Sequence, residues 1–161
     1  MTQNIFTLKI GGQAGQGIKS AGLVLAKVST RSGFSVYTHI EYPSLIRGGH
    51  NVMQIAVSRE EVTAPGKTTN LLIALNQETL DRHFLELTPN SGVLFDSEAD
   101  FETGKIGSGI NLYPVPLSSL AASAGGKELL GNSVALGAAV ALLGGDLKIL
   151  QDLLREEFAS K

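Results

Sequence analysis

Residues 5–33 read as a strand, a glycine-rich turn and a helix, in that order. The stretch "IFTLKI" at residues 5–10 is strand-like and ends at a pair of glycines. After the turn, apolar or small residues recur at helical spacing from Ile18 until Gly33 stops the helix. A strand that runs through a glycine turn into a helix is typical of an α/β fold.

The remainder of the chain continues this alternation of short apolar runs and helical patterns. We predict further strands at residues 34–40, 51–58, 70–75, 92–96 and 110–115, and helices at residues 77–87, 132–143 and 146–158. This order indicates an α/β sheet with parallel strands. A chain of 161 residues with 43% apolar residues has the size of one core, so we expect a single domain, residues 1–161.

Composition excludes several classes of function. The formal charge of -2 gives no basic field for nucleic acid, and the apolar run at residues 134–143 is too short to span a bilayer. We expect a cytoplasmic protein with no nucleic-acid or membrane partner. Because the chain has no Cys, it has no thiolate for an iron–sulfur cluster, and we predict no metal site on it. Any metal centre for electron transfer would lie on another chain.

The glycine cluster "GGQAGQGIKS" predicts a site for an anion. Gly12, Gly15 and Gly17 are spaced G-x-x-G-x-G, which matches neither the dinucleotide fingerprint nor a Walker loop. Glycines at the start of a helix nevertheless let backbone N–H groups face a phosphate. Further donors are available from Gln13, Gln16, Lys19 and Ser20. The alternative is that the glycines only permit a tight turn and close packing.

Three motifs resemble one family. They are the turn G-G-x-A-G-Q-G-I, the loop "EYPSLIRGGHN" at residues 41–51, and "NSVALGAAVALL" at residues 132–143. In these the chain resembles the gamma subunit or gamma domain of the 2-oxoacid:ferredoxin oxidoreductases, which act on pyruvate, 2-oxoglutarate or branched-chain ketoacids. The resemblance implies a Rossmann-like three-layer domain with a mostly parallel sheet and helices on both faces. It also implies a role in holding coenzyme A.

The chemistry that the resemblance implies cannot lie on this chain alone. The thiamine-diphosphate pattern of G-D-G followed by Asn is absent, as are the cluster cysteines. We therefore expect no catalytic residue here, and thiamine diphosphate, magnesium and iron–sulfur clusters on alpha, beta or delta parts, with ferredoxin as the electron acceptor. The chain could be a separate subunit or the front of a fused gamma–alpha chain. The alternatives are a freestanding nucleotide- or phosphate-binding module and a purely structural interface subunit.

The loop at residues 41–51 is assigned roles on the same basis. Arg47 is the candidate partner of a coenzyme A phosphate or of a partner-chain acid, and His50 and Asn51 are neutral donors beside it. The alternative for His50 is a strand-end imidazole bonded to backbone. We read His83 as part of a solvated helix face, and Asn132 as a helix N-cap that the resemblance adds to the site. The candidate coenzyme A contacts are Gly12, Gln13, Gly15, Gln16, Gly17, Ser20, Arg47, Gly48, Gly49, His50 and Asn132, and the candidate interface residues are Tyr42, Pro43 and Leu45.

Overall fold

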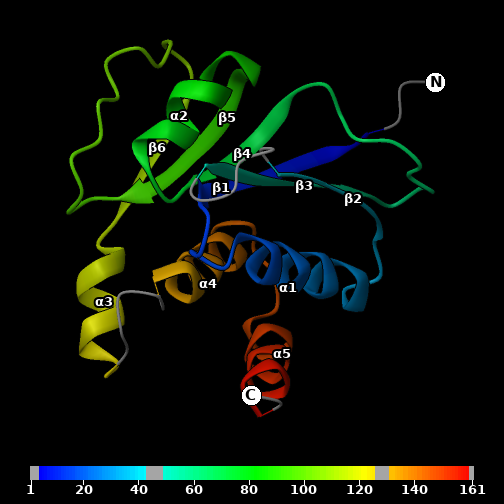
Figure 1. Ribbon diagram of the computed structural model, residues 1–161. Helices are drawn as coiled ribbons and strands as arrows, with labels where there is room; N and C mark the ends of the chain where they lie inside the picture. The colour runs from blue at the N-terminus through cyan, green and yellow to red at the C-terminus, as the bar shows by residue number, and fades with distance from the viewer. Residues whose placement is uncertain (1–3, 43–48, 126–130, 160–161) are drawn as a thin grey trace.

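The computed structural model describes residues 4–42, 49–125 and 131–159, without the side chains of the last two residues. One six-stranded sheet with helices on both of its faces makes up the fold (Figure 1). The strands are β1 Phe6–Gln13, β2 Ser35–Glu41, β3 His50–Ser58, β4 Thr69–Ala74, β5 Leu87–Asp96 and β6 Asn111–Val115. The helices are α1 Ile18–Arg31, α2 Gln77–His83, the 3-10 turn η1 Phe84–Glu86, α3 Leu117–Ser123, α4 Gly131–Leu142 and α5 Leu147–Ala159.

The order of strands in the sheet is β2-β3-β1-β4-β5-β6. Parallel pairs join β1 to β4, β4 to β5 and β5 to β6, whereas β3 runs antiparallel to both of its neighbours. The carboxyl ends of the parallel strands therefore share one edge of the sheet. Because β3 runs the other way, its first residue lies at that same edge, where His50 pairs with Gln13 at the end of β1.

The two faces of the sheet bury cores of different size. The larger core lies under α1 and α4 and also takes in Leu150 and Leu153 of α5, which packs against those two helices (Figure 1). The smaller core lies under α2 and η1 and contains Leu72, Leu80 and Val93. This arrangement confirms the predicted α/β class with helices on both faces, and corrects the expectation of parallel strands at β3.

Local chemistry explains where the helices begin and how closely they pack. The side-chain oxygen of Asn76 accepts a hydrogen bond from Thr79 N at 3.0 Å at the start of α2, and Asp146 accepts from Lys148 N at 2.8 Å at the start of α5. Gly22 brings α1 close to β3, since a Cβ there would lie 2.4 Å from the sulfur of Met53. No helix in the described part of the chain combines the length and apolar character needed to cross a bilayer.

Several predicted boundaries change. The helix predicted at residues 77–87 stops at His83 and continues as η1, and the strand predicted at residues 92–96 begins earlier, at Leu87. Helix α3 was not predicted at all. Its amino end is held by Asp96, whose carboxylate accepts from Leu117 N at 3.1 Å and from Ser118 N at 3.2 Å. A cap supplied by a residue 21 positions away leaves no local signature.

Candidate functional site

The glycine turn lies between the end of β1 and the start of α1. Gly15 and Gly17 have φ angles of 95° and 70°, which side chains rarely adopt. The turn is closed by Gln16 N donating to Gln13 O at 3.1 Å, and the Gln16 side chain accepts from Gln13 N at 2.6 Å. Gln16 was predicted to add a donor for the ligand, and its side-chain oxygen is engaged inside the turn.

The amino end of α1 carries backbone donors that no side chain caps. The first helical hydrogen bond runs from Ala21 N to Gly17 O at 2.9 Å, so the N–H groups of Ile18, Lys19 and Ser20 have no acceptor within the helix. The first turn contains no acidic residue, and Lys19 and Ser20 are exposed. A Cβ built on Gly15 would have no atom within 4 Å, so the space beside the turn is open.

The starts of α2, α3 and α5 differ from that of α1. Asn76 caps α2, Asp96 and Glu98 accept from backbone N–H groups of α3, and Asp146 caps α5. Each of these starts has a side-chain oxygen in the position that an anion would otherwise occupy. The start of α1 therefore has the positive potential of a helix amino end without a carboxylate or amide that neutralises it.

Asn132 connects α4 to the glycine turn. Its Nδ2 donates to Gln16 O at 2.9 Å, and a Cβ on Gly17 would lie 2.6 Å from that nitrogen. Since α4 begins at Gly131, Asn132 lies inside the first helical turn and the interpretation as an N-cap is wrong. The residue fastens two segments that are 116 positions apart in the sequence.

A small pocket of about 160 Å³ lies between these elements. It is lined by Gln16, Leu75, Asp96, Leu117, Ser118 and Asn132, among others. Asp96 was not predicted as a site residue, although a charged residue that ends a buried strand is a signal that could have indicated it. Its carboxylate is negative and buried, so a phosphate is better accommodated at the Gly15 side of the turn than in this pocket.

The loop at residues 41–51 reaches the same edge of the sheet. Gly49 has a φ of 99°, and its carbonyl accepts from Ala14 N at 3.0 Å, so the end of the loop is hydrogen-bonded to the glycine turn. Tyr42 is 56% exposed after β2. Pro43, Leu45, Arg47 and Gly48 lie outside the described residues, and their roles stay predictions.

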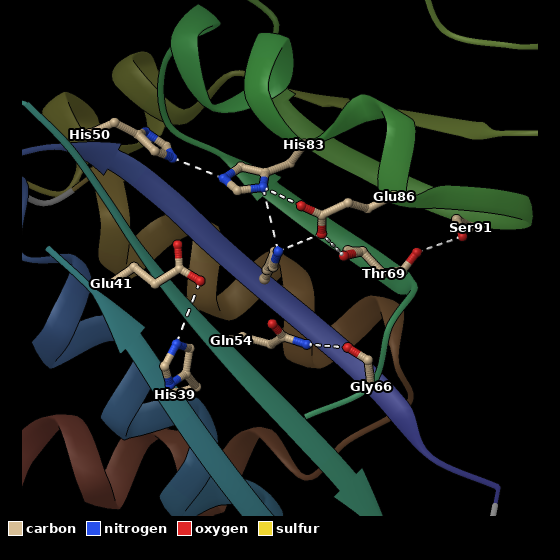
Figure 2. A network of polar contacts seen from close by, with 10 residues as sticks. His39, Glu41, His50, Gln54, Gly66, Thr69, His83, Glu86 and Ser91 are labelled. Carbon is tan, nitrogen blue, oxygen red and sulfur yellow. Dashed lines mark hydrogen bonds and ion pairs between the residues drawn. The ribbon is translucent and has the colours of Figure 1, made fainter. Parts of the chain in front are cut away.

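A buried polar network begins at His50 and extends under α2 (Figure 2). His50 Nε2 lies 3.0 Å from His83 Nε2, and His83 Nδ1 lies 2.7 Å from a Glu86 carboxylate oxygen. The ammonium of Lys9 on β1 forms an ion pair with Glu86 and lies 3.4 Å from His83 Nδ1. Thr69 donates to the same carboxylate at 3.0 Å.

Lys9, His50 and His83 are buried and Glu86 is partly buried, and this burial affects the pKa values in the network. Burial alone would raise the pKa of Glu86, but hydrogen bonds from His83 and Lys9 outweigh it and hold that pKa at about 2. Burial lowers the pKa of His50, and the neighbouring His83 lowers it further.

His83 is buried, and its ring bonds join His50 to Glu86, so the prediction of a solvated helix face is wrong. The alternative for His50, an imidazole bonded to backbone, is also wrong, because its ring bond goes to the side chain of His83.

Lys9 was missed by sequence reasoning, although a lysine inside the apolar strand "IFTLKI" is a signal of a buried partner. Across the described residues, no group of three His, Asp or Glu side chains is arranged to hold a metal ion. The members of the network are joined by hydrogen bonds and an ion pair.

Comparison with known proteins gives related subunits. Subunit VorA of ketoisovalerate oxidoreductase from Methanothermobacter thermautotrophicus is 31% identical over 157 residues, which cover 96% of this chain and 32% of VorA. Subunit KorC of 2-oxoglutarate synthase from Archaeoglobus fulgidus is 29% identical over 138 residues, which cover 85% of this chain and 70% of KorC. The chain thus spans about a third of the length of VorA.

Solved structures have the same fold. The 2-oxoglutarate:ferredoxin oxidoreductase from Magnetococcus marinus, with 2-oxoglutarate, coenzyme A and succinyl-CoA bound, matches with a TM-score of 0.89 and 28% identity. The match covers 99% of this chain and 28% of that one. The gamma subunit of a keto/oxoacid ferredoxin oxidoreductase from Geobacter sulfurreducens matches with a TM-score of 0.80 and 25% identity, over 95% of this chain and 85% of that one.

The model of one protein family, pyruvate ferredoxin/flavodoxin oxidoreductase, matches residues 7–161, which include the glycine turn, the loop and helix α4. The chain therefore belongs to the pyruvate ferredoxin/flavodoxin oxidoreductase family.

Proposed function

We propose that this chain is the gamma component of a 2-oxoacid:ferredoxin oxidoreductase, in which it helps to bind coenzyme A and to assemble the complex. It is not catalytic alone. Thiamine diphosphate with magnesium, and iron–sulfur clusters, lie on alpha and beta parts, and on a delta part where the complex has one. Ferredoxin receives the electrons through that complex. We place the complex in the cytoplasm, since coenzyme A is a metabolite of the cell interior.

The observation that carries this proposal is the uncapped amino end of α1. Three backbone N–H groups, the dipole of a 14-residue helix and the exposed Lys19 and Ser20 favour a phosphate beside Gly15. Coenzyme A carries phosphates, and the Magnetococcus marinus relative was solved with coenzyme A bound. We call the uncapped amino end of α1 beside Gly15 the phosphate seat. Together with the family match, it supports coenzyme A as the ligand.

The other predicted contacts fit around this seat. Gly49 is bonded to the turn through Ala14, and Asn132 keeps the turn in shape from α4. Arg47 would add a charged donor from the loop, either to a coenzyme A phosphate or to an acid on the alpha part. Tyr42, Pro43 and Leu45 would contact the partner chain.

When the complex is assembled, thiamine diphosphate supplies the carbanion chemistry and the clusters carry electrons. This chain has no cysteine to hold a cluster. Its own residues bind and orient the acyl acceptor: α1 holds a phosphate, and the loop brings polar groups to the same edge of the sheet.

Reconstitution tests the proposal. The purified chain should show no 2-oxoacid oxidation with thiamine diphosphate and an artificial acceptor, and activity should return when alpha and beta parts are added. Turnover by the isolated chain would support a freestanding enzyme. The chain would be a purely structural subunit if it assembles with the alpha and beta parts, but these parts bind coenzyme A equally well with and without it.

A further inference from the structure

A second pocket, of about 370 Å³, lies at the carboxyl edge of the sheet on the α2 side. It is lined by Glu41, Tyr42, His50, Val52, Arg82 and His83. His50 is 8% exposed, and its ring is confined by β1, since a Cβ on Gly11 would lie 2.9 Å from His50 Cε1. Its Nε2 meets His83, but no residue in the described ranges hydrogen-bonds its Nδ1. A buried ring nitrogen without a partner is costly unless a ligand supplies one.

The network behind His50 determines which ring nitrogen carries the proton. Glu86 is a carboxylate, so His83 Nδ1 at 2.7 Å must donate to it. In the neutral ring of His83, Nε2 is then the acceptor, and His50 Nε2 must be the donor across the 3.0 Å contact. This leaves the Nδ1 of His50 without a proton.

The charges around the network oppose a further positive charge on the two rings. Lys9 and Glu86 already compensate each other, and the Lys9 ammonium 3.4 Å from His83 Nδ1 opposes a second positive charge there. For His50, burial and the nearby His83 and Arg82 oppose protonation, while Glu78 and Glu41 favour it. Together these effects lower the pKa of His50, with burial as the largest cause.

We infer that His50 is a ligand-binding acceptor: it is held as the neutral Nε2–H tautomer by His83, and its Nδ1 accepts a hydrogen bond from an amide N–H or a hydroxyl group. His83, Glu86 and Lys9 are positioning residues that act through His50. This reverses the expectation that His50 is a donor.

The pocket suits an uncharged chain of amides and hydroxyls. Arg82 is paired with Glu78 at 2.8 Å, Glu41 lies 3.5 Å from His39, and Val52 adds an apolar surface. His50 is the register partner of Gln13, so the pocket adjoins the glycine turn. Because coenzyme A joins phosphates to a pantetheine arm with two amides and a hydroxyl, one molecule could contact both places. The identity of this donor rests on the proposed function, whereas the tautomer of His50 does not.

Nitrogen NMR of the labelled chain measures the tautomer directly. The chain has three histidines, so long-range correlations give three ring patterns, and His39→Gln and His83→Phe assign them. We expect His50 to keep a protonated Nε2 and a bare Nδ1 from about pH 6 to pH 8. His83→Phe removes the acceptor and should let His50 exchange between tautomers. His39→Gln, which changes an exposed ring outside the pocket lining, should leave the tautomer of His50 unchanged.

Addition of coenzyme A, and of pantetheine alone, tests the ligand. An accepted hydrogen bond should move the His50 Nδ1 resonance upfield with both compounds, while only coenzyme A should move the amide resonances of Gly15 and Gly17. If coenzyme A moves only the amide resonances of Gly15 and Gly17, the inference about His50 is overturned and the proposed phosphate seat stands. If it moves only the Nδ1 resonance of His50, the inference is supported and the proposed phosphate seat is overturned.

Two further results would overturn the inference without any variant. One is a wild-type His50 that is protonated, or that carries its proton on Nδ1, at neutral pH. The other is an Nδ1 resonance already at the hydrogen-bonded position in the free chain and unchanged by coenzyme A.

Discussion

Replacing Gly15 by Ala separates the ligand role of the turn from its structural role. A Cβ at Gly15 meets no atom within 4 Å, so the substitution causes no clash inside the chain. Its structural cost comes from the φ of 95°, and we expect about 1–2 kcal/mol of lost stability. If the methyl group displaces a phosphate from one N–H group, coenzyme A loses a hydrogen bond to a charged group. That loss corresponds to about 1.5–3 kcal/mol, or roughly a ten- to 150-fold rise in the Michaelis constant.

Gly33→Ala is the matched control. Gly33 follows the opposite end of α1, has a φ of 86°, and likewise offers open space to a Cβ, with no atom within 4 Å. Chemical denaturation should therefore show a similar loss of stability in both variants. Only Gly15→Ala should weaken the binding of coenzyme A in the assembled complex. The half-reaction that precedes coenzyme A should be normal in both. An unchanged Michaelis constant in Gly15→Ala, with the stability loss present, would refute a phosphate seat at this turn.

Three further perturbations give distinct outcomes. Arg47→Ala should weaken the binding of coenzyme A by about 1.5–3 kcal/mol without dissociating the complex, and Arg47→Lys should retain part of that binding energy. Weaker assembly in sedimentation, with normal kinetics for coenzyme A, would indicate that Arg47 pairs with an acid on the partner chain instead. Glu86→Gln should cost about 3 kcal/mol at pH 7, because the buried ammonium of Lys9 loses its partly buried, charged partner. Folding lowers the pKa of Glu86 from 4.5 to about 2, so the stabilisation by its carboxylate is complete above pH 4.5 and is lost as the pH falls through 2. In acid denaturation, the stabilities of the wild-type protein and Glu86→Gln should therefore become equal near pH 2. Gly22→Ala should be about 1–3 kcal/mol less stable than Gly137→Ala, a mid-helix change into open space; equal stabilities would contradict close packing of α1 on Met53.

Local patterns predicted most of the elements, because strands and helices here are specified by residues close in sequence. Residues 71–74 of the run "NLLIAL" are buried in β4, and the 3.6-residue period of α1 places Ile18, Ala21 and Leu25 in the core. The direction of β3 was not predicted, because a buried strand has no pattern that distinguishes its two directions. The signal lay in the connection: eight residues join β2 to β3, fewer than the roughly dozen that a crossover between parallel strands needs.

The site was predictable in its parts and not in its connections. The local preferences of glycine and proline indicated the turn and the loop. The Asn-containing helix was added to the site only by the resemblance to the family. The sequence did not indicate that Asn132 bonds the turn or that Lys9 meets His83, because these pairs are 116 and 74 residues apart. His83 stands beside Asp81 and Arg82 in sequence, which suggested a solvated face, yet the helix turns it towards β1.

The central position of β1 has a consequence for how the chain folds during synthesis. Among the six strands of the sheet this one is made before the others, and both of its neighbours, β3 and β4, are made later. Until residue 58 has left the ribosome, β1 lacks its complete antiparallel partner, and the hydrogen bond from Ala14 to Gly49 cannot fix the glycine turn. At about 5–20 residues per second, β1 and α1 wait for seconds with their apolar surfaces uncovered. Nascent chains arrested before β4 should therefore bind chaperones and remain sensitive to protease, and the phosphate seat should form only when the sheet closes around β1.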